Sequence, residues 1–245
     1  MFIKNNKGIY QIKELLLPGL IHGFSTKKFG NMSFKFEEKD EVFANQKGFL
    51  NLLDINAEVA QPHLDHTTLV KKVDKPGIFP RVDGLITNQV GLPLLITTAD
   101  CAPILLFDPK NRVIGLVHSG WMGTVGKISL IAIGKMIAEF KCQPENIIVG
   151  FGPSIEKCCF VENGAALQEN LPEWKNYISV ERGDKRRYDL NSFTINQLKE
   201  IGIKDDSIFY DSFCTKDHKN DFYCSQLETA GVEKPGRFAT VIQMA

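Results

Sequence analysis

Three segments of the sequence place metal-binding side chains directly against apolar runs: Gln61 to His66, Thr97 to Pro103 and Val117 to Trp121. Cys101 and His118 stand at the ends of two runs that we expect to be strands, where sites in α/β proteins usually lie. A thiolate and two imidazoles suit Zn²⁺, and three protein ligands leave the fourth tetrahedral position for water or substrate. The same side chains also fit an interpretation without a metal, as a buried cysteine and hydrogen-bonded histidines.

The elements that must position these residues are short apolar strands and amphipathic helices. Runs bounded by Gly, Pro and Asp predict buried strands at 92–96, 104–107, 113–117, 146–149, 207–210 and 238–242. Helical spacing of apolar residues predicts helices at 40–53, 121–140 and 189–201. Their alternation predicts an α/β or mixed α+β fold. Backbone N–H groups where Ser119 and Gly120 begin the second helix would suit an anion such as phosphate.

The composition excludes several classes of function. The chain has 245 residues, with 29 Lys and Arg against 29 Asp and Glu, so no net positive field attracts nucleic acid. The N-terminus lacks a secretory signal, and no apolar run approaches the roughly 18 residues that span a membrane. We therefore expect a cytoplasmic protein with six reduced cysteines. Five histidines are too few for a multicopper site but enough for one small metal site.

Several motifs occur in order along nearly the whole chain. They are Gln61-Pro62-His63, Asp83-Gly84-Leu85-Ile86-Thr87, Ala99-Asp100-Cys101-Ala102-Pro103, His118-Ser119-Gly120-Trp121, Gly152-Pro153-Ser154-Ile155 with Cys158-Cys159, and Cys214-Thr215. In these motifs the sequence resembles the YfiH family, whose members are variously called laccase-domain proteins, polyphenol oxidases, peptidoglycan editing factors and purine nucleoside phosphorylases.

The resemblance implies a single domain over residues 1–245, built as a four-layer α/β/β/α sandwich with mixed β-sheets. It also implies a metal site whose ligands are His63, Cys101 and His118. Zinc is the expected ion, with copper possible as a substitute. His66 is expected to be a surface residue or a neighbour of the ligands, and the chain is expected to be a monomer or a small homo-oligomer.

Relatives of this kind cleave purine nucleosides with phosphate and deaminate adenosine, so purine nucleosides and phosphate are the expected small-molecule partners. Asp100 and Asp83 are our candidates for proton transfer or for orienting a ligand. A capping role for Asp100 and a turn role for Asp83 are the structural alternatives. Two family arginines are replaced, by Gln46 and by Gln226-Leu227, whereas Arg237 fits the family pattern. Either phosphorolysis is weaker here than in relatives, or phosphate uses other donors.

Two other functions remain open from the sequence. Cys101 and His118 are also the nucleophile and base that a cysteine hydrolase needs, acting on an amide such as one in a peptidoglycan precursor. The family's names further suggest a copper-dependent phenol oxidase, against which the small number of histidines argues.

Overall fold

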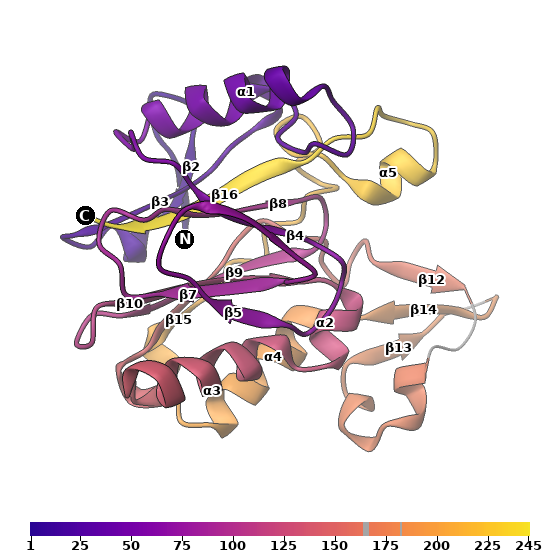
Figure 1. Cartoon of the computed structure of the whole chain (residues 1–245). Helices are drawn as coiled ribbons and strands as arrows, with labels where there is room; N and C mark the ends of the chain where they lie inside the picture. The colour runs from indigo at the N-terminus through magenta and orange to yellow at the C-terminus, as the bar shows by residue number, and fades with distance from the viewer. Residues whose placement is uncertain (164–166, 182) are drawn as a thin grey trace.

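Apolar strands form the centre of the structure. The structure is a computed structural model, and it describes residues 1–163, 167–181 and 183–245. Two large mixed β-sheets pack face to face (Figure 1). Helix α1 (Lys39–Asn51) covers the outer face of the first sheet, while α3 (Ile128–Phe140) and α4 (Leu190–Glu200) cover the outer face of the second. The α/β/β/α layering and the mixed sheets confirm the predicted fold class.

The first sheet has seven strands within the described residues, in the order β1-β2-β3-β16-β8-β4-β6. Strand β4 is parallel to both β8 and β6, and the other pairs are antiparallel. The strands are β1 (Phe2–Lys4), β2 (Tyr10–Ile12), β3 (Leu20–Phe24), β4 (Ala60–His63), β6 (Gly77–Pro80), β8 (Leu94–Thr98) and β16 (Phe238–Met244).

The second sheet has six strands within the same ranges, in the order β15-β11-β9-β10-β7-β5. They are β5 (Val70–Lys72), β7 (Gly84–Thr87), β9 (Ala102–Asp108), β10 (Val113–Ser119), β11 (Ile148–Phe151) and β15 (Ile208–Phe209). A separate antiparallel sheet joins β12 (Val161–Asn163), β14 (Lys185–Tyr188) and β13 (Ile178–Val180).

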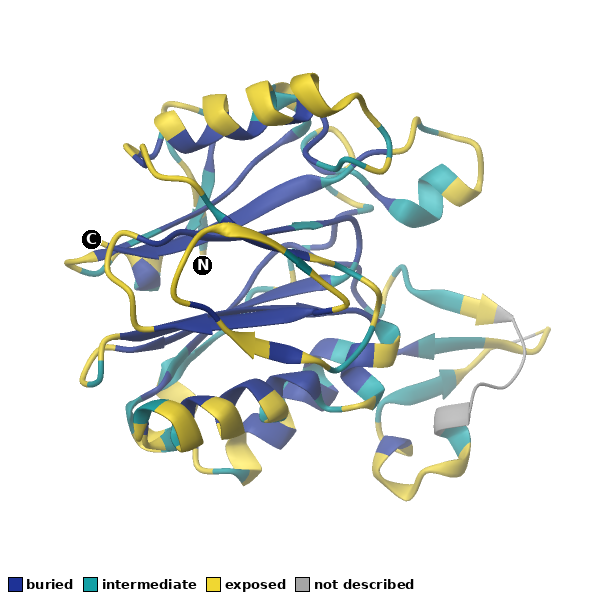
Figure 2. Ribbon diagram, in the orientation of Figure 1, coloured by how far each residue is buried: buried dark blue, intermediate teal, exposed yellow. Residues whose placement is uncertain are grey.

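The central strands are apolar on both faces because each face meets a different layer. In β9, Leu105 and Phe107 pack between the two sheets, whereas Ile104 and Leu106 pack toward α3. Successive side chains of a strand point to opposite faces, so a strand buried on both sides needs a continuous apolar run. Figure 2 shows these strands buried along most of their length, while α1 is buried mainly on its sheet side.

One predicted helix is wrong. The segment expected as a single helix at 121–140 is divided into α2 (Trp121–Val125) and α3 by Gly126 and Lys127. Lys127 has a left-handed backbone with φ of 59°, and a Cβ on Gly126 would lie 2.3 Å from Cγ2 of Thr68. The apolar periodicity continues across this break, so the sequence did not reveal it. Because the helix that starts after Gly120 has only five residues, we withdraw it as an anion site.

The remaining helical segments are short and connect the larger elements. They are α5 (Ser225–Thr229) and the 3₁₀ turns η1 (Lys13–Leu15), η2 (Lys27–Phe29), η3 (Pro144–Asn146), η4 (Leu167–Asn170), η5 (Pro172–Trp174) and η6 (Asp205–Ser207). Among the described residues, no helix has the length and apolar character needed to cross a membrane.

Three connections pass from the first sheet to the second at one common edge. They link β4 to β5, β6 to β7 and β8 to β9, and they carry His66, Asp83 and Cys101 respectively. Because β4 is parallel to β6 and β8, the carboxyl ends of these three strands meet at one edge. Strand β10 is antiparallel to β7 and β9, so His118, near its end, arrives at this edge as well.

The buried Asp83 carboxylate joins two of these connections to β10. It accepts hydrogen bonds from the backbone N–H groups of Asp65 (3.3 Å), His66 (3.0 Å) and Thr67 (2.7 Å) and from the Thr67 hydroxyl (2.7 Å). It also lies 2.8 Å from Nδ1 of His118. Burial raises the pKa of Asp83, but these hydrogen bonds outweigh burial and lower it to about 2. The carboxylate is therefore charged, buried and fully engaged.

We predict that Asp83→Asn lowers the free energy of unfolding by about 2–4 kcal/mol at pH 7, because an amide cannot accept all of these bonds. The lowered pKa means that the charged group stabilises the fold above its ordinary pKa of 3.8, and that this contribution is lost as the pH falls toward 2. Urea unfolding with a chelator present, at pH 7 and at pH 2.5, measures both effects.

The matched control is Asp74→Asn, which changes an exposed carboxyl group and should shift the free energy of unfolding by less than about 0.5 kcal/mol. Equal stability of wild type and Asp83→Asn at pH 7 would contradict the role given to Asp83.

Candidate active site

His66, Cys101 and His118 come together where the connections cross between the sheets. One possible ligand atom from each residue lies within 4.8 Å of the others. The rings of His66 and His118 are 4.9 Å apart between centroids and meet edge to face at 73°. Three donors of the kinds that zinc prefers therefore converge on one small region, drawn from three separate segments of the chain.

Gly120 keeps the space between these donors open. A Cβ atom on Gly120 would lie 2.9 Å from Sγ of Cys101 and 3.0 Å from Nδ1 of His66. The backbone of Gly120 is extended, so the reason for glycine here is space and not an unusual φ. Any larger residue at position 120 would fill the space between the three donors, which we call the cradle. The donor set and this open cradle together fit a metal ion.

Asp83 determines how His118 presents its ring. The hydrogen bond between Nδ1 of His118 and Asp83 directs the proton to Nδ1 and leaves Nε2 as the donor atom toward the cradle. Burial lowers the pKa of His118, but the adjacent Cys101 and Asp83 outweigh burial and raise it to about 9. The buried Asp83 carboxylate thus places negative charge beside His118, which favours a bound cation as much as a bound proton.

His66 is held in an unusual backbone conformation at the same place. Its φ is 57°, in the left-handed region that few residues other than glycine adopt. Two of the hydrogen bonds to Asp83 come from His66 itself and from its neighbour Thr67, and they support this conformation. Burial and the proximity of His118 lower the pKa of His66, so its ring is neutral and able to donate a lone pair.

His63, the ligand that the motif predicts, is not part of this group within the described residues. Its side chain is 70% exposed, and its Nδ1 is 3.3 Å from Oδ1 of Asp65. Cys101 and His118, the other two predicted ligands, are grouped with His66, an exposed residue that we had expected to be a surface residue or a neighbour of the ligands. Spacing alone does not distinguish His63, at the end of β4, from His66, three residues later, because the backbone conformation decides which ring approaches Cys101.

Asp100, our other candidate for proton transfer, is directed away toward neighbouring segments. Its buried carboxylate accepts hydrogen bonds from the hydroxyl of Thr215 (2.6 Å) and the backbone N–H of Gln226 (2.9 Å). The Cys224 thiol is a third partner at 3.5 Å. Asp100 also has a left-handed backbone, with φ of 76°, immediately before Cys101. These contacts match the capping alternative and hold the turn that carries Cys101.

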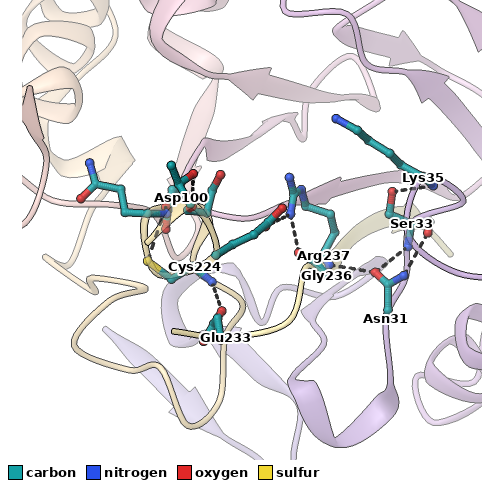
Figure 3. Close-up of polar contacts among 12 residues, drawn as sticks. Asn31, Ser33, Lys35, Asp100, Cys224, Glu233, Gly236 and Arg237 are labelled. Carbon is teal, nitrogen blue, oxygen red and sulfur yellow. Dashed lines mark hydrogen bonds and ion pairs between the residues drawn. The ribbon is translucent and has the colours of Figure 1, made fainter. Parts of the chain in front are cut away.

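Two cations lie beside the candidate site. Both Lys35 and Arg237 lower the pKa of His66 through their positive charge. Figure 3 shows their side chains extending toward the same side of the close-up. Arg237 donates to Glu228 at 2.9 Å, and its guanidinium lies 4.5 Å from the ring centroid of Phe36. Arg237 belongs to a motif that the sequence shows before its last strand, whereas Lys35 belongs to no motif, so its place beside the site could not be predicted.

The glutamine that replaces a family arginine in α1 has a structural role. Gln46 is buried and donates to the carbonyl of Met32 (2.9 Å) and to Oε1 of Gln61 (3.3 Å). It lines a cavity of about 550 Å³ whose wall also includes Phe34, Phe43 and Gln61. This volume is within the range of small-molecule sites, and Gln61 lies two residues before His63.

Comparisons with known proteins give the family. Residues 21–245 match the family described as multi-copper polyphenol oxidoreductase laccase. A purine nucleoside phosphorylase of Clostridium acetobutylicum is 30% identical over 210 residues, which cover 85% of this chain and 87% of that protein. A purine nucleoside phosphorylase of Mus musculus is 33% identical over 162 residues, but these cover 60% of this chain and only 37% of the mouse protein.

Solved structures agree in fold. A Bacillus licheniformis protein titled hypothetical protein YfiH superposes with a TM-score of 0.90 at 22% identity, covering 100% of this chain and 99% of that one. YlmD from Geobacillus stearothermophilus also gives a TM-score of 0.90 at 22% identity, covering 99% and 98%. The fold and the match over residues 21–245 show that this chain belongs to the multi-copper polyphenol oxidoreductase laccase family, the laccase-domain family that its motifs resemble.

Proposed function

We propose that this protein is a zinc-dependent purine nucleoside phosphorylase that also deaminates adenosine. Its substrates would be inosine, adenosine, guanosine or methylthioadenosine together with phosphate. The observation that carries the proposal is the convergence of His66, Cys101 and His118 around a cradle that Gly120 keeps open, beside the cations Lys35 and Arg237. The relatives from Clostridium acetobutylicum and Mus musculus are named purine nucleoside phosphorylases, which supports phosphorolysis of purine nucleosides as the reaction.

In phosphorolysis, an oxygen of phosphate forms a bond to C1′ of the sugar while the bond from C1′ to the purine nitrogen breaks. Lys35 and Arg237 would bind and orient the phosphate, which raises its effective concentration at C1′. Arg237 is suited to this role because its contacts with Glu228 and Phe36 hold the guanidinium in place.

In deamination, water adds to C6 of adenine and ammonia leaves. A bound zinc ion supplies a Lewis acid and lowers the pKa of water to about 7. The chain's own contribution is the fixed orientation of His118 by Asp83 and the negative charge around it. Asp83 and Asp100 would act by positioning His118 and Cys101, since their carboxylates are occupied by hydrogen bonds.

A second candidate function rests on the contacts that join Cys101 to His118 and His118 to Asp83. A thiol beside an imidazole, which in turn is hydrogen-bonded to a carboxylate, is the arrangement of a cysteine hydrolase. This function requires that no metal occupies both Cys101 and His118. Modification of Cys101 by iodoacetamide at equal rates with and without zinc would favour the hydrolase, and protection by zinc would favour the phosphorylase.

We predict that the purified protein with zinc converts inosine and phosphate to hypoxanthine and ribose 1-phosphate. Cys101→Ala and His118→Ala should each lower the turnover about 100-fold or more, because loss of outer partners of a metal already costs about 10–100-fold. The control is Cys142→Ala, which alters a buried thiol in the core beneath α3. Chromatographic detection of the released base measures the rate. Absence of turnover of all four nucleosides at saturating phosphate would refute the proposal.

His63 and His66 give opposite predictions for the third ligand. The geometry favours His66, so His66→Ala should hold about one zinc ion per chain fewer than the wild type, whereas His63→Ala should hold as much zinc as the wild type. Mass-spectrometric metal analysis of both variants, each checked for folding by circular dichroism, measures this. Loss of zinc in His63→Ala alone would instead support the ligand that the motif predicts.

We predict that Lys35→Gln and Arg237→Gln each raise the KM for phosphate about ten-fold or more, with little change in the KM for inosine. Loss of a charge-assisted hydrogen bond to phosphate is the cause. Lys135→Gln removes an exposed charge on α3 and serves as the control. Steady-state kinetics of this control should show a near-normal KM for phosphate. An equal rise for inosine and phosphate would count against a phosphate site here.

A further inference from the structure

A second group of metal-binding side chains lies outside the candidate active site. Cys158, Cys159, Cys214 and Asp217 offer ligand atoms that all lie within 4.8 Å of one another. Sγ of Cys158 is 3.4 Å from Sγ of Cys159, and these two sulfurs are 3.7 Å and 3.6 Å from the carboxylate oxygens of Asp217. We propose that these four residues bind a zinc ion as a closed, four-coordinate site that is separate from the catalytic one.

The distances suit a tetrahedral ion. A zinc–sulfur bond of about 2.3 Å separates two ligands of a tetrahedron by about 3.7 Å, and a shorter zinc–oxygen bond brings sulfur and oxygen slightly closer. The measured separations of 3.4, 3.6 and 3.7 Å agree with this spacing. A disulfide would require sulfur atoms about 2 Å apart. The thiols are therefore gathered at ligand spacing and are not bonded to one another.

The backbone already holds the two contributing segments together. Ser154 and Cys214 form a parallel bridge, in which the Thr215 N–H donates to the Ser154 carbonyl at 3.0 Å. The His218 N–H donates to the Cys214 carbonyl at 3.0 Å and closes the turn that brings Asp217 beside Cys214. The ligands are thus arranged before any ion binds, which lowers the entropy that binding must overcome.

The spacing of these residues in the sequence does not predict a metal site. Structural zinc sites commonly use pairs of cysteines separated by two residues, and the chain has no such pair. Cys214-Thr215-Lys216-Asp217 has that spacing, with a carboxylate where the second thiolate would stand. The other two ligands are adjacent in sequence, a pattern that predicts no metal by itself. Only the bridge between Ser154 and Cys214 brings the two pairs together.

An ion would bind to this group in exchange for protons. Arg187 donates to the backbone carbonyl of Cys158 and so helps to fix the segment that carries two of the ligands. A divalent ion with soft-ligand affinity would bind as the three thiols release their protons to solvent. Cys158 and Asp217 are exposed, which gives the ion a path of entry.

The position of the group links it to the candidate active site. Thr215 follows Cys214 directly and donates to Asp100, and the N–H of Ile155 donates to the Asp100 carbonyl at 2.8 Å. Both zinc-binding segments therefore contact the residue that precedes Cys101. With four protein ligands the ion has no open position for a substrate, so its role is to tie these segments together.

The test is the zinc content of the full-length protein, purified under reducing conditions and measured without nucleoside or phosphate. We expect about two zinc ions per chain in the wild type and about one in Cys101→Ala. Cys158→Ser and Asp217→Asn change exposed ligands, so these variants should fold and should lose the second ion, with affinity lowered about ten-fold or more. The buried Cys142→Ala serves as the thiol control.

Cobalt substitution gives a second readout that does not depend on activity. In Cys101→Ala, the remaining cobalt ion should show sulfur-to-metal charge-transfer absorption from three thiolates, and Cys158→Ser in that background should remove most of it, because this variant loses the ion. One zinc ion in the wild type and none in Cys101→Ala would overturn the proposal. A disulfide among these cysteines in reduced, zinc-supplied protein would overturn it as well.

Discussion

One buried carboxylate, that of Asp83, joins the segments that carry the candidate active site. Asp83 lies on a connection between the two sheets, accepts hydrogen bonds from the neighbouring connection at residues 65–67, and contacts His118 of β10. Its charge is stabilised by these donors in a place where an unpaired charge would be strongly unfavourable. The left-handed backbone of His66 and the ring orientation of His118 both depend on it. Asp83 therefore joins the stability of the fold to the geometry of the site.

The crossing of the chain between two sheets explains why chemistry gathers at this edge. Parallel strands β4, β6 and β8 deliver their carboxyl ends together, and each then passes to the other sheet. The connections run where backbone groups are not all used by sheet pairing, and polar side chains satisfy them. The Cys158 group lies close by, because its segments contact Asp100 on the third connection. Two groups of possible metal ligands thus meet at the turn 99–101, one including Cys101 itself and the other contacting Asp100.

Apolar patterns in the sequence predicted part of the fold. The runs at 104–107 and 113–117 became β9 and β10, and the periodicity at 40–53 became α1, but five of the seven described strands of the first sheet had no predicted counterpart. The helix predicted over 121–140 is divided at Gly126 and Lys127, where Thr68, distant in sequence, packs against Gly126. Periodicity carries no information about such a contact. The motifs indicated Cys101 and His118, which the structure brings together with His66.

The sequence alone determined the mixed α/β class, several of the strands and helices, and which residue types are available for binding a metal, whereas the four layers followed from the family resemblance of its motifs. Hydrophobic periodicity and strand alternation are local properties, so they can be read from neighbouring positions. Only the tertiary structure decided that His66 and not His63 faces Cys101, that Asp83 and Asp100 are engaged as supports, and that Cys158, Cys159, Cys214 and Asp217 meet. These are contacts between distant segments, and their geometry depends on backbone conformation and sheet pairing that no local pattern encodes.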